Sequence, residues 1–139
     1  MRLHIIARGR IGRGPEAELV ARYVKRMAWP TVLTELGETA PLPDALPHSR
    51  TVVLDERGAA LATRPFADRL ARWRDDGVRE TRFLIGAADG HDAGTRDGAD
   101  LLLSFGPATW PHLLVRGMLA EQLYRATSLL AGHPYHREG

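Results

Sequence analysis

The sequence predicts a single α/β domain built on a mostly parallel sheet of five strands with helices on both faces. Short, continuous apolar runs alternate with amphipathic helical stretches along all 139 residues. This is the pattern of a parallel sheet that is buried on both sides. The length suits one domain with its own core. No internal repeat or linker divides the chain, so we expect residues 1–139 to form one domain.

Each element follows from a local pattern. Apolar runs bounded by turn residues predict the strands, which are expected at Leu3–Ala7, Thr31–Leu36, Thr51–Asp55, Thr81–Ile85 and Leu101–Ser104. Apolar residues at helical spacing predict the helices, which are expected at Glu16–Met27, about Pro65–Asp76 and about His112–Ala131. Gly77 and Gly132 are expected to end the last two helices. Three prolines make residues 37–49 a loop, and Glu56–Gly58 is expected to break the third strand.

The composition is that of an ordinary soluble protein, with 44% hydrophobic and 26% charged residues. The absence of cysteine excludes disulfides, thiol catalysis, zinc fingers and iron–sulfur clusters. No run approaches the roughly 18 apolar residues of a membrane span. The short run Leu3–Ala7 fits a strand better than a signal peptide. We therefore expect a cytoplasmic protein that has no membrane partner.

Positive charge is concentrated in residues 1–30, although the net charge of the chain is only +2. Seven basic groups stand there against Glu16 and Glu18, and Lys25 is the only lysine among the chain's 19 basic residues. An arginine-rich surface suits phosphate, because a guanidinium group binds two oxygens at once. The alternative is a solvated helix face in a protein rich in arginine throughout, and charge alone does not separate the two.

Ligands of parallel sheets bind at the carboxyl ends of the strands, which here means the segments after Leu54, Ile85 and Ser104. The turn Gly86–Gly90 matches neither the dinucleotide fingerprint nor a P-loop, and alone it is most often a plain turn. The stretch Gly106–Pro111 holds two prolines, which fix a backbone shape at low entropic cost. A rigid loop at a strand end is what a small-molecule pocket needs.

The last predicted helix is apolar almost all round. Its polar residues are Arg116, Glu121, Gln122, Arg125 and Ser128. A helix so apolar must bury a second face. In so short a chain the favoured partner is a second copy across a two-fold axis, and the alternative is a helix at the centre of the core. We therefore expect a homodimer.

The tail carries His133, Tyr135, His136 and Arg137. A metal site at the two histidines is not expected, because Pro134 separates them, no cysteine is near and carboxylate partners are not evident. Tyrosine, histidine and arginine together offer stacking, a titratable imidazole and an anion clamp, which suits an RNA base and its phosphate. A frayed, solvated terminus is the alternative. No serine–histidine–aspartate arrangement is recognisable.

Three C-terminal motifs carry a resemblance to a known family. They are Leu103-Ser104-Phe105 through Arg116, the run Glu121-Gln122-Leu123-Tyr124-Arg125-Ala126, and the tail Pro134-Tyr135-His136-Arg137-Glu138. With the opening strand, the Leu54-Asp55 strand end and Leu84-Ile85-Gly86, they resemble the ribosomal RNA large subunit methyltransferase H family. Its members are the 23S rRNA pseudouridine N3-methyltransferases of the SPOUT superfamily. The resemblance covers nearly the whole chain, and the C-terminal third is highly specific.

The resemblance implies a SPOUT methyltransferase fold with a C-terminal trefoil knot, a homodimer, and S-adenosylmethionine as cofactor. It implies methylation of N3 of a pseudouridine in the helix 69 loop of 23S rRNA, with the assembled ribosome as substrate. No metal is implied. Carried over position by position, the cofactor contacts are Leu54, Gly86, Phe105, Gly106, Pro107, Ala108, Thr109 and Trp110.

The resemblance also implies catalytic roles for the tail. Tyr135 and His136 are expected to reach from one subunit to the other subunit's cofactor and to hold the base. His136 is the candidate base for the N3 proton, and Arg137 is expected to stabilise the developing charge on the imide. Two other functions stay open at this point. One is a non-catalytic, ribosome-associated dimer, and the other is a SPOUT methyltransferase with another RNA target.

Overall fold

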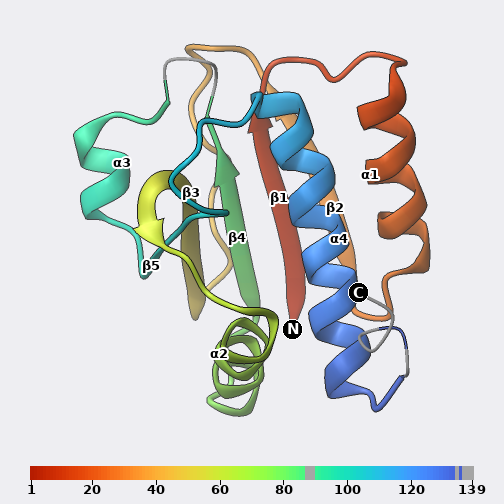
Figure 1. Ribbon diagram of the computed structural model, residues 1–139. Helices are drawn as coiled ribbons and strands as arrows, with labels where there is room; N and C mark the ends of the chain where they lie inside the picture. The colour runs from red at the N-terminus through yellow and green to blue at the C-terminus, as the bar shows by residue number, and fades with distance from the viewer. Residues whose placement is uncertain (87–89, 134, 136–139) are drawn as a thin grey trace.

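Five parallel strands form the centre of the protein, as the sequence predicts (Figure 1). In this computed structural model, the structure describes residues 1–86, 90–133 and 135. The strands stand in the order β2-β1-β4-β3-β5, and every neighbouring pair is parallel. Their bounds are Arg2–Arg8 (β1), Thr31–Leu36 (β2), Ser49–Ala59 (β3), Glu80–Ile85 (β4) and Leu101–Leu103 (β5).

The helices of the described chain are Pro15–Arg26 (α1), Thr63–Asp75 (α2), Ala93–Asp97 (α3) and His112–Leu130 (α4). Three of them confirm the predicted helices to within two residues at each end. Gly77 and Gly132 follow α2 and α4 with φ angles of +86° and +76°, the left-handed geometry that ends a helix. None of these helices has the length and apolar character that a membrane crossing requires.

The short helix α3 was not predicted from the sequence. Its N-terminus is fixed by Asp92, whose Oδ1 accepts a hydrogen bond from the Thr95 backbone N–H at 2.7 Å. Five residues are too few to show a helical period of apolar residues, so the pattern that predicts the longer helices is missing here.

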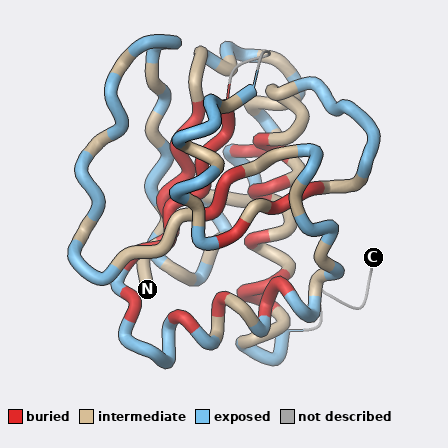
Figure 2. Tube along the Cα trace, turned by 90° about the vertical axis from the view of Figure 1, so that its left-hand side faces the viewer, coloured by how far each residue is buried: buried red, intermediate tan, exposed pale blue. Residues whose placement is uncertain are grey.

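One face of the sheet carries the three long helices. Leu3 and Ile5 of β1 share a buried core with Phe83 of β4, Leu70 of α2 and Leu119 of α4. Helix α4 packs against both α1 and α2, so it lies between them. Figure 2 shows the result, with buried residues gathered in the strands and on the inner sides of the helices, and exposed residues along the outer loops.

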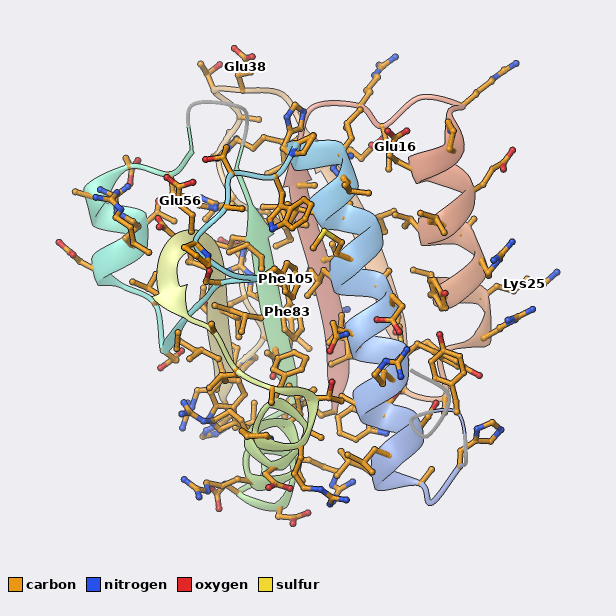
Figure 3. All side chains as sticks on the ribbon, viewed as in Figure 1. Glu16, Lys25, Glu38, Glu56, Phe83 and Phe105 are labelled. Atoms are coloured by element: carbon orange, nitrogen blue, oxygen red, sulfur yellow. The ribbon has the colours of Figure 1, made fainter. Side chains whose placement is uncertain are left out.

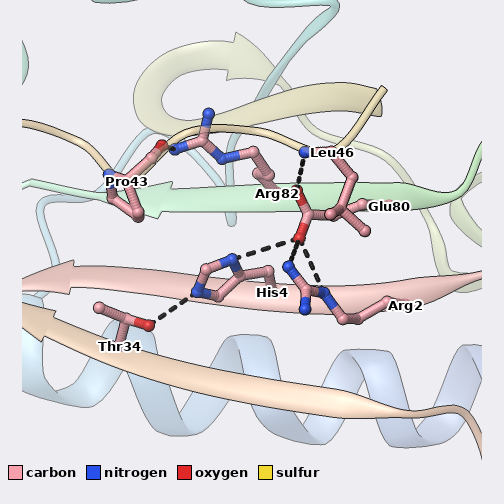
Figure 4. A network of polar contacts seen from close by, with 7 residues as sticks. All are labelled: Arg2, His4, Thr34, Pro43, Leu46, Glu80 and Arg82. Atoms are coloured by element: carbon pink, nitrogen blue, oxygen red, sulfur yellow. Dashed lines mark hydrogen bonds and ion pairs between the residues drawn. The ribbon is translucent and has the colours of Figure 1, made fainter. Parts of the chain in front are cut away.

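The other face of the sheet is covered differently. A second, smaller buried cluster forms there from Ile6, Val53 and Leu84, with Ala99 just beyond α3 packed against it. The proline-rich segment 37–48 lies over the same face. Figure 4 shows two of the contacts that attach it. Arg82 donates to the Pro43 carbonyl at 2.7 Å, and the Leu46 N–H donates to the Glu80 carboxylate at 3.3 Å. Helices therefore lie on both sides of the sheet, but very unequally.

A buried polar network joins three strands beneath that segment (Figure 4). The Glu80 carboxylate accepts a hydrogen bond from Arg2 Nε at 2.8 Å and lies 3.4 Å from His4 Nδ1. His4 Nε2 lies 2.7 Å from the Thr34 hydroxyl on β2. Burial lowers the pKa of His4. Burial alone raises the pKa of Glu80, but the hydrogen bonds from Arg2 and Leu46 outweigh it, and the net pKa is lowered.

The predicted break in the third strand is wrong. Strand β3 continues through Glu56–Gly58 and pairs again with β5 at Ala59, after a register shift. The glycine has a different purpose: a Cβ at Gly58 would lie 2.6 Å from the carbonyl carbon of Leu102. Gly58 therefore lets the backbones of β3 and β5 approach closely, which no other residue type would allow.

Burial within its own chain accounts for most of the apolar surface of helix α4. None of its residues is exposed, and Arg116 on it is only 1% exposed. The alternative of a helix at the centre of the core therefore accounts for most of its apolar residues. Leu114 and Met118 remain half-buried on a groove beside α1. The homodimer stays a prediction.

Candidate functional site

The carboxyl ends of β3, β4 and β5 enclose a cavity of about 570 Å³. Its size falls in the range of small-molecule sites, roughly 300–1,000 Å³. Seven of the eight predicted cofactor contacts line it: Leu54, Gly86, Phe105, Gly106, Ala108, Thr109 and Trp110. Pro107 lies in the same loop but is not part of the lining. We call this space the strand-end cavity.

The loop 104–111 is held in shape by side chains of its own ends. The Ser104 hydroxyl accepts a hydrogen bond from the Gly106 N–H at 3.0 Å and lies 2.8 Å from the Gly106 carbonyl oxygen. Gly106 has a φ of +111°, which a residue with a side chain rarely adopts. The Thr109 hydroxyl donates to Glu56 Oε2 at 2.9 Å, so β3 holds the far end of the loop. The loop is therefore set before any ligand binds.

The turn after β4 forms the second wall. A Cβ at Gly86 would lie 3.0 Å from the carbonyl carbon and oxygen of Gly90, so the backbone folds back tightly at this point. Gly90 itself has a φ of +81°. The three residues between them, 87–89, lie outside the described residues. Gly86 and Gly90 thus let the end of β4 and the start of the next described segment approach each other closely.

Several ionisable side chains at the cavity were missed by sequence reasoning. Asp55 directly follows Leu54, and its carboxylate is only 9% exposed. Arg57 Nε lies 3.6 Å from Asp55 Oδ1, and Arg96 Nε lies 3.8 Å from Asp55 Oδ2. His112, at the start of α4, also lines the cavity. The position of Asp55 at a strand end was a usable signal, whereas Arg96 sits on the unpredicted helix α3.

His91 is a further lining residue that no sequence pattern indicated. Burial lowers the pKa of its imidazole below the ordinary value of 6.5. Its Nε2 atom is buried, and among the described residues it has no hydrogen-bond partner. A buried acceptor or donor of this kind is uncommon and calls for a ligand, a water or a proton to satisfy it.

Tyr135 lies elsewhere, against α1 and α4 of its own chain. Its hydroxyl lies 3.4 Å from the Tyr23 hydroxyl and 3.3 Å from Glu121 Oε1, and its ring packs 4.7 Å from the Tyr124 ring. Burial, together with the Tyr23 hydroxyl and the Glu121 charge, raises its pKa. Tyr135 does not line the strand-end cavity of its own chain. The predicted catalytic residues His136 and Arg137 lie outside the described residues.

The basic N-terminal region divides into two groups. Arg2 pairs with Glu80, and Arg8 donates to the carbonyls of Gly37 and Ala40 at 2.8 and 2.7 Å, so these two arginines stabilise the fold. The others are exposed: Arg10 and Arg13 before α1, and Arg22, Lys25 and Arg26 on it. Figure 3 shows Lys25 pointing away from the sheet. These five side chains, which we call the basic edge, are free to meet an anionic partner.

The chemistry of the cavity is that of binding and orientation. Its walls combine apolar and aromatic side chains with the charges of Asp55, Arg57 and Arg96. Among the described residues, no group of histidine, aspartate and glutamate side chains could hold a metal ion. An amphipathic molecule with an aromatic ring and charged groups fits such a lining.

Comparison with known proteins gives consistent results. The profile of a family described as “Predicted SPOUT methyltransferase” matches residues 34–136. A protein of Novosphingobium aromaticivorans is 67% identical to this chain and one of Rhizorhabdus wittichii is 66% identical, and each match covers 100% of both chains. Both relatives are named “Ribosomal RNA large subunit methyltransferase H”.

Two solved structures share the fold. A probable methyltransferase from Bordetella pertussis Tohama I aligns with a TM-score of 0.60 and 15% identity, over 91% of this chain and 94% of that one. A probable methylase family protein from Haemophilus influenzae Rd KW20 aligns with a TM-score of 0.63 and 13% identity, over 96% of this chain and 69% of that one. At such low identity the likeness concerns the fold alone.

Proposed function

The chain belongs to the SPOUT methyltransferase family and is a methyltransferase of large-subunit ribosomal RNA, and on this premise we propose its cofactor, target atom and substrate. The cofactor is S-adenosylmethionine. The target is N3 of a pseudouridine in the helix 69 loop of 23S rRNA, and the substrate is the assembled ribosome in the cytoplasm. One observation carries the proposal most directly: seven contacts carried over from the family line a single cavity at the strand ends.

The residues of the cavity fit the proposed cofactor. Leu54, Phe105 and Trp110 offer apolar and aromatic surface for an adenine ring. Asp55 and Arg57 offer charges of both signs for the ammonium and carboxylate of a methionyl group. The buried, unsatisfied Nε2 of His91 is ready for a polar group of a ligand. The preset loop 104–111 reduces the entropy lost when the cofactor binds.

S-adenosylmethionine supplies a methyl group on a positively charged sulfur. The contribution of the chain is to align that methyl with the ring nitrogen and to exclude water. The N3 imide must lose its proton, and we assign the tail residue His136 as the base. Arg137 stabilises the negative charge that develops on the imide. Tyr135 holds the pseudouridine ring by stacking against it.

A homodimer explains why Tyr135 is remote from the cavity of its own chain. A groove of about 680 Å³ lies along α4 and is bordered by α1, by residues 60–63 and by residues 104–106. Tyr23 and Glu121, the two residues nearest the Tyr135 hydroxyl, line this groove, and so do Phe105 and Gly106 of the strand-end cavity. A second copy seated on the groove would bring its own tail close to this cavity. The trefoil knot of the family likewise stays a prediction.

The basic edge provides the contact with rRNA. Its five exposed cations project from α1 and from the segment before it, and arginine forks suit phosphate oxygens. The basic edge therefore serves the docking of the large anionic substrate, while the strand-end cavity binds the small-molecule cofactor.

The decisive experiment incubates the protein with methyl-labelled S-adenosylmethionine and assembled ribosomes that lack this modification. Naked 23S rRNA runs in parallel, and the labelled nucleoside is identified by mass. We expect label on N3 of pseudouridine from ribosomes only. Label on another nucleoside would identify a different RNA target. Cofactor binding without any label would instead favour a ribosome-associated dimer that has lost its chemistry.

A further inference from the structure

His91 lies at the junction of two cavities and beside a predicted cofactor contact. It lines the strand-end cavity and also a second cavity of about 420 Å³ on the opposite side of the β4 strand end. A Cβ at Gly86 would lie only 3.3 Å from His91 Cε1, so the ring packs directly on the turn that follows β4. Arg96 donates to the His91 carbonyl at 2.7 Å and fixes its backbone.

The hydrogen bonding of this imidazole is incomplete. Nε2 is buried and has no partner among the residues that the structure describes. Burial lowers the pKa of the ring, and the charges of Arg8 on β1 and Arg96 on α3 act in the same direction. The Leu84 backbone and the Asp55 carboxylate oppose the shift without reversing it. The ring is therefore neutral at pH 7, and a neutral imidazole has one nitrogen that accepts.

A ligand in the strand-end cavity can satisfy that acceptor. Nε2 is bonded to Cε1, which is the ring atom nearest the Gly86 Cβ position, and Gly86 and His91 both line the cavity. The adenosyl group of the proposed cofactor carries suitable donors in its adenine amine and ribose hydroxyls. A buried polar pair of this kind gives specificity, because an analogue without the donor leaves the nitrogen unpaired.

We propose that His91 Nε2 accepts a hydrogen bond from the adenosyl group of S-adenosylmethionine and so positions the cofactor against the Gly86 turn. This inference rests on the proposed function, because it requires that cofactor in the strand-end cavity. His91 is not among the cofactor contacts carried over from the family. It extends the binding site onto the segment that joins β4 to α3.

The test measures the affinity of S-adenosylhomocysteine for the full chain by calorimetry. His91→Phe fills the space without an acceptor, and His91→Gln places an amide oxygen near the position of Nε2. We expect His91→Phe to weaken binding about tenfold, and His91→Gln to stay within about threefold of the unmodified protein. Thermal unfolding without ligand shows whether each variant folds normally.

A pH series separates hydrogen bonding from packing. Protonation turns Nε2 into a donor, so the affinity of the unmodified protein should fall as the pH drops from 7.5 to 5.5. The His91→Gln variant should show a flatter profile. Asp55, Arg8, Arg96 and Asp92 are the charged groups around the ring, and all four are present in both proteins.

S-inosylhomocysteine, in which a carbonyl replaces the adenine amine, identifies the donor. About tenfold weaker binding of this analogue to the unmodified protein, with no such difference in His91→Phe, assigns the contact to the amine. Equal binding of the two ligands to the unmodified protein, with His91→Phe still weakened, assigns it to a ribose hydroxyl.

Two results would overturn the inference. One is unchanged affinity in His91→Phe, and the other is an equal loss in His91→Phe and His91→Gln with the same pH profile as the unmodified protein. Failure of the proposed function looks different, because the unmodified protein would then not bind S-adenosylhomocysteine at all.

Discussion

Arg116 on α4 and Glu35 on β2 form an ion pair in which Nη1 lies 2.7 Å from Oε2. The arginine is 1% exposed, and its Nη2 also donates to the carbonyls of Arg8 and Gly9 at 2.8 Å each. One buried guanidinium therefore connects the helix that follows the cavity loop to the ends of β1 and β2. Glu35 also accepts from the Ile11 N–H at 2.8 Å, which ties down the start of the segment before α1.

Replacing this arginine should strongly destabilise the protein. In Arg116→Met the carbonyls of Arg8 and Gly9 lose their donor and the Glu35 carboxylate loses its charge partner, so we expect a loss of about 3 kcal/mol in the free energy of unfolding. Urea denaturation measures it. Glu35→Gln is the matched control, with an expected loss of about 1 kcal/mol, because this carboxylate is partly exposed and the amide still accepts a hydrogen bond. Equal losses would contradict the role assigned to the carbonyl contacts.

The close approach of β3 and β5 at Gly58 predicts that a side chain at this position destabilises the protein. Gly58→Ala puts a Cβ 2.6 Å from Leu102 backbone atoms, so β3 and β5 must separate, at an expected cost of about 2–3 kcal/mol in unfolding free energy. Because β5 leads into the loop 104–111, the affinity for S-adenosylhomocysteine should fall several-fold as well.

Gly37→Ala is the control for that substitution. Nothing lies within 4 Å of a Cβ at Gly37, so stability and affinity should barely change. A Gly58→Ala variant as stable as Gly37→Ala would show that β5 can shift without cost.

Stability should decrease in acid because of His4 and Glu80. Both pKa values are lowered in the folded protein, so the unfolded chain takes up each proton first. The contribution of His4 is complete above its ordinary pKa of 6.5 and is lost as the pH falls below it, and that of Glu80 is lost below its ordinary 4.5.

Urea unfolding at pH 7.5, 6, 5 and 4 checks this expectation. His4→Gln should flatten the upper part of the curve, between about pH 7 and 5. Replacing the exposed His48 by asparagine is the control, since asparagine also tolerates its φ of 56°. An equal slope in His4→Gln and the unmodified protein would contradict the assignment.

Ribosome binding should depend on salt through the basic edge. Each phosphate contact adds about 0.7–0.9 to the slope of log affinity against log salt concentration. The double variant Arg10→Ala/Arg13→Ala should lower that slope by about 1–2 and weaken binding, whereas Arg64→Ala, an exposed arginine on α2, should do neither. Filter binding over a range of potassium chloride concentrations gives the slopes. The same slope in the double variant would exclude these two arginines from the contact.

The sequence predicted those parts of the fold that depend on short-range patterns. The apolar run of β2 gave its bounds to the residue, and Gly77 and Gly132 correctly ended two helices. The reading of Gly58 as a strand breaker failed, because its role depends on β5, which lies more than 40 residues away. From the sequence, Arg116 is only one of several polar residues on the last helix, because the pattern of an almost wholly apolar helix does not indicate which side faces the core.

The candidate site, like the fold, was predictable from the sequence only in part. The strand-end rule and the family motifs together located the segments that surround the cavity. His91 and Arg96 belong to no motif and reach the cavity only because the chain turns after β4 and forms α3. A short helix and a single histidine leave no periodic signal, so only the three-dimensional arrangement reveals them.

The strand order also governs how the chain can fold while it is being made. β1 stands between β2 and β4, and Arg2 meets Glu80 across 78 positions of sequence. One edge of β1 therefore stays unpaired until β4 has been synthesised, about 4–16 s later at about 5–20 residues per second. The α4 helix that covers β1 comes later still. The nascent chain thus carries an unpaired edge on an interior strand of its sheet until more than half of the sequence has been made, and such an edge favours pairing with other chains.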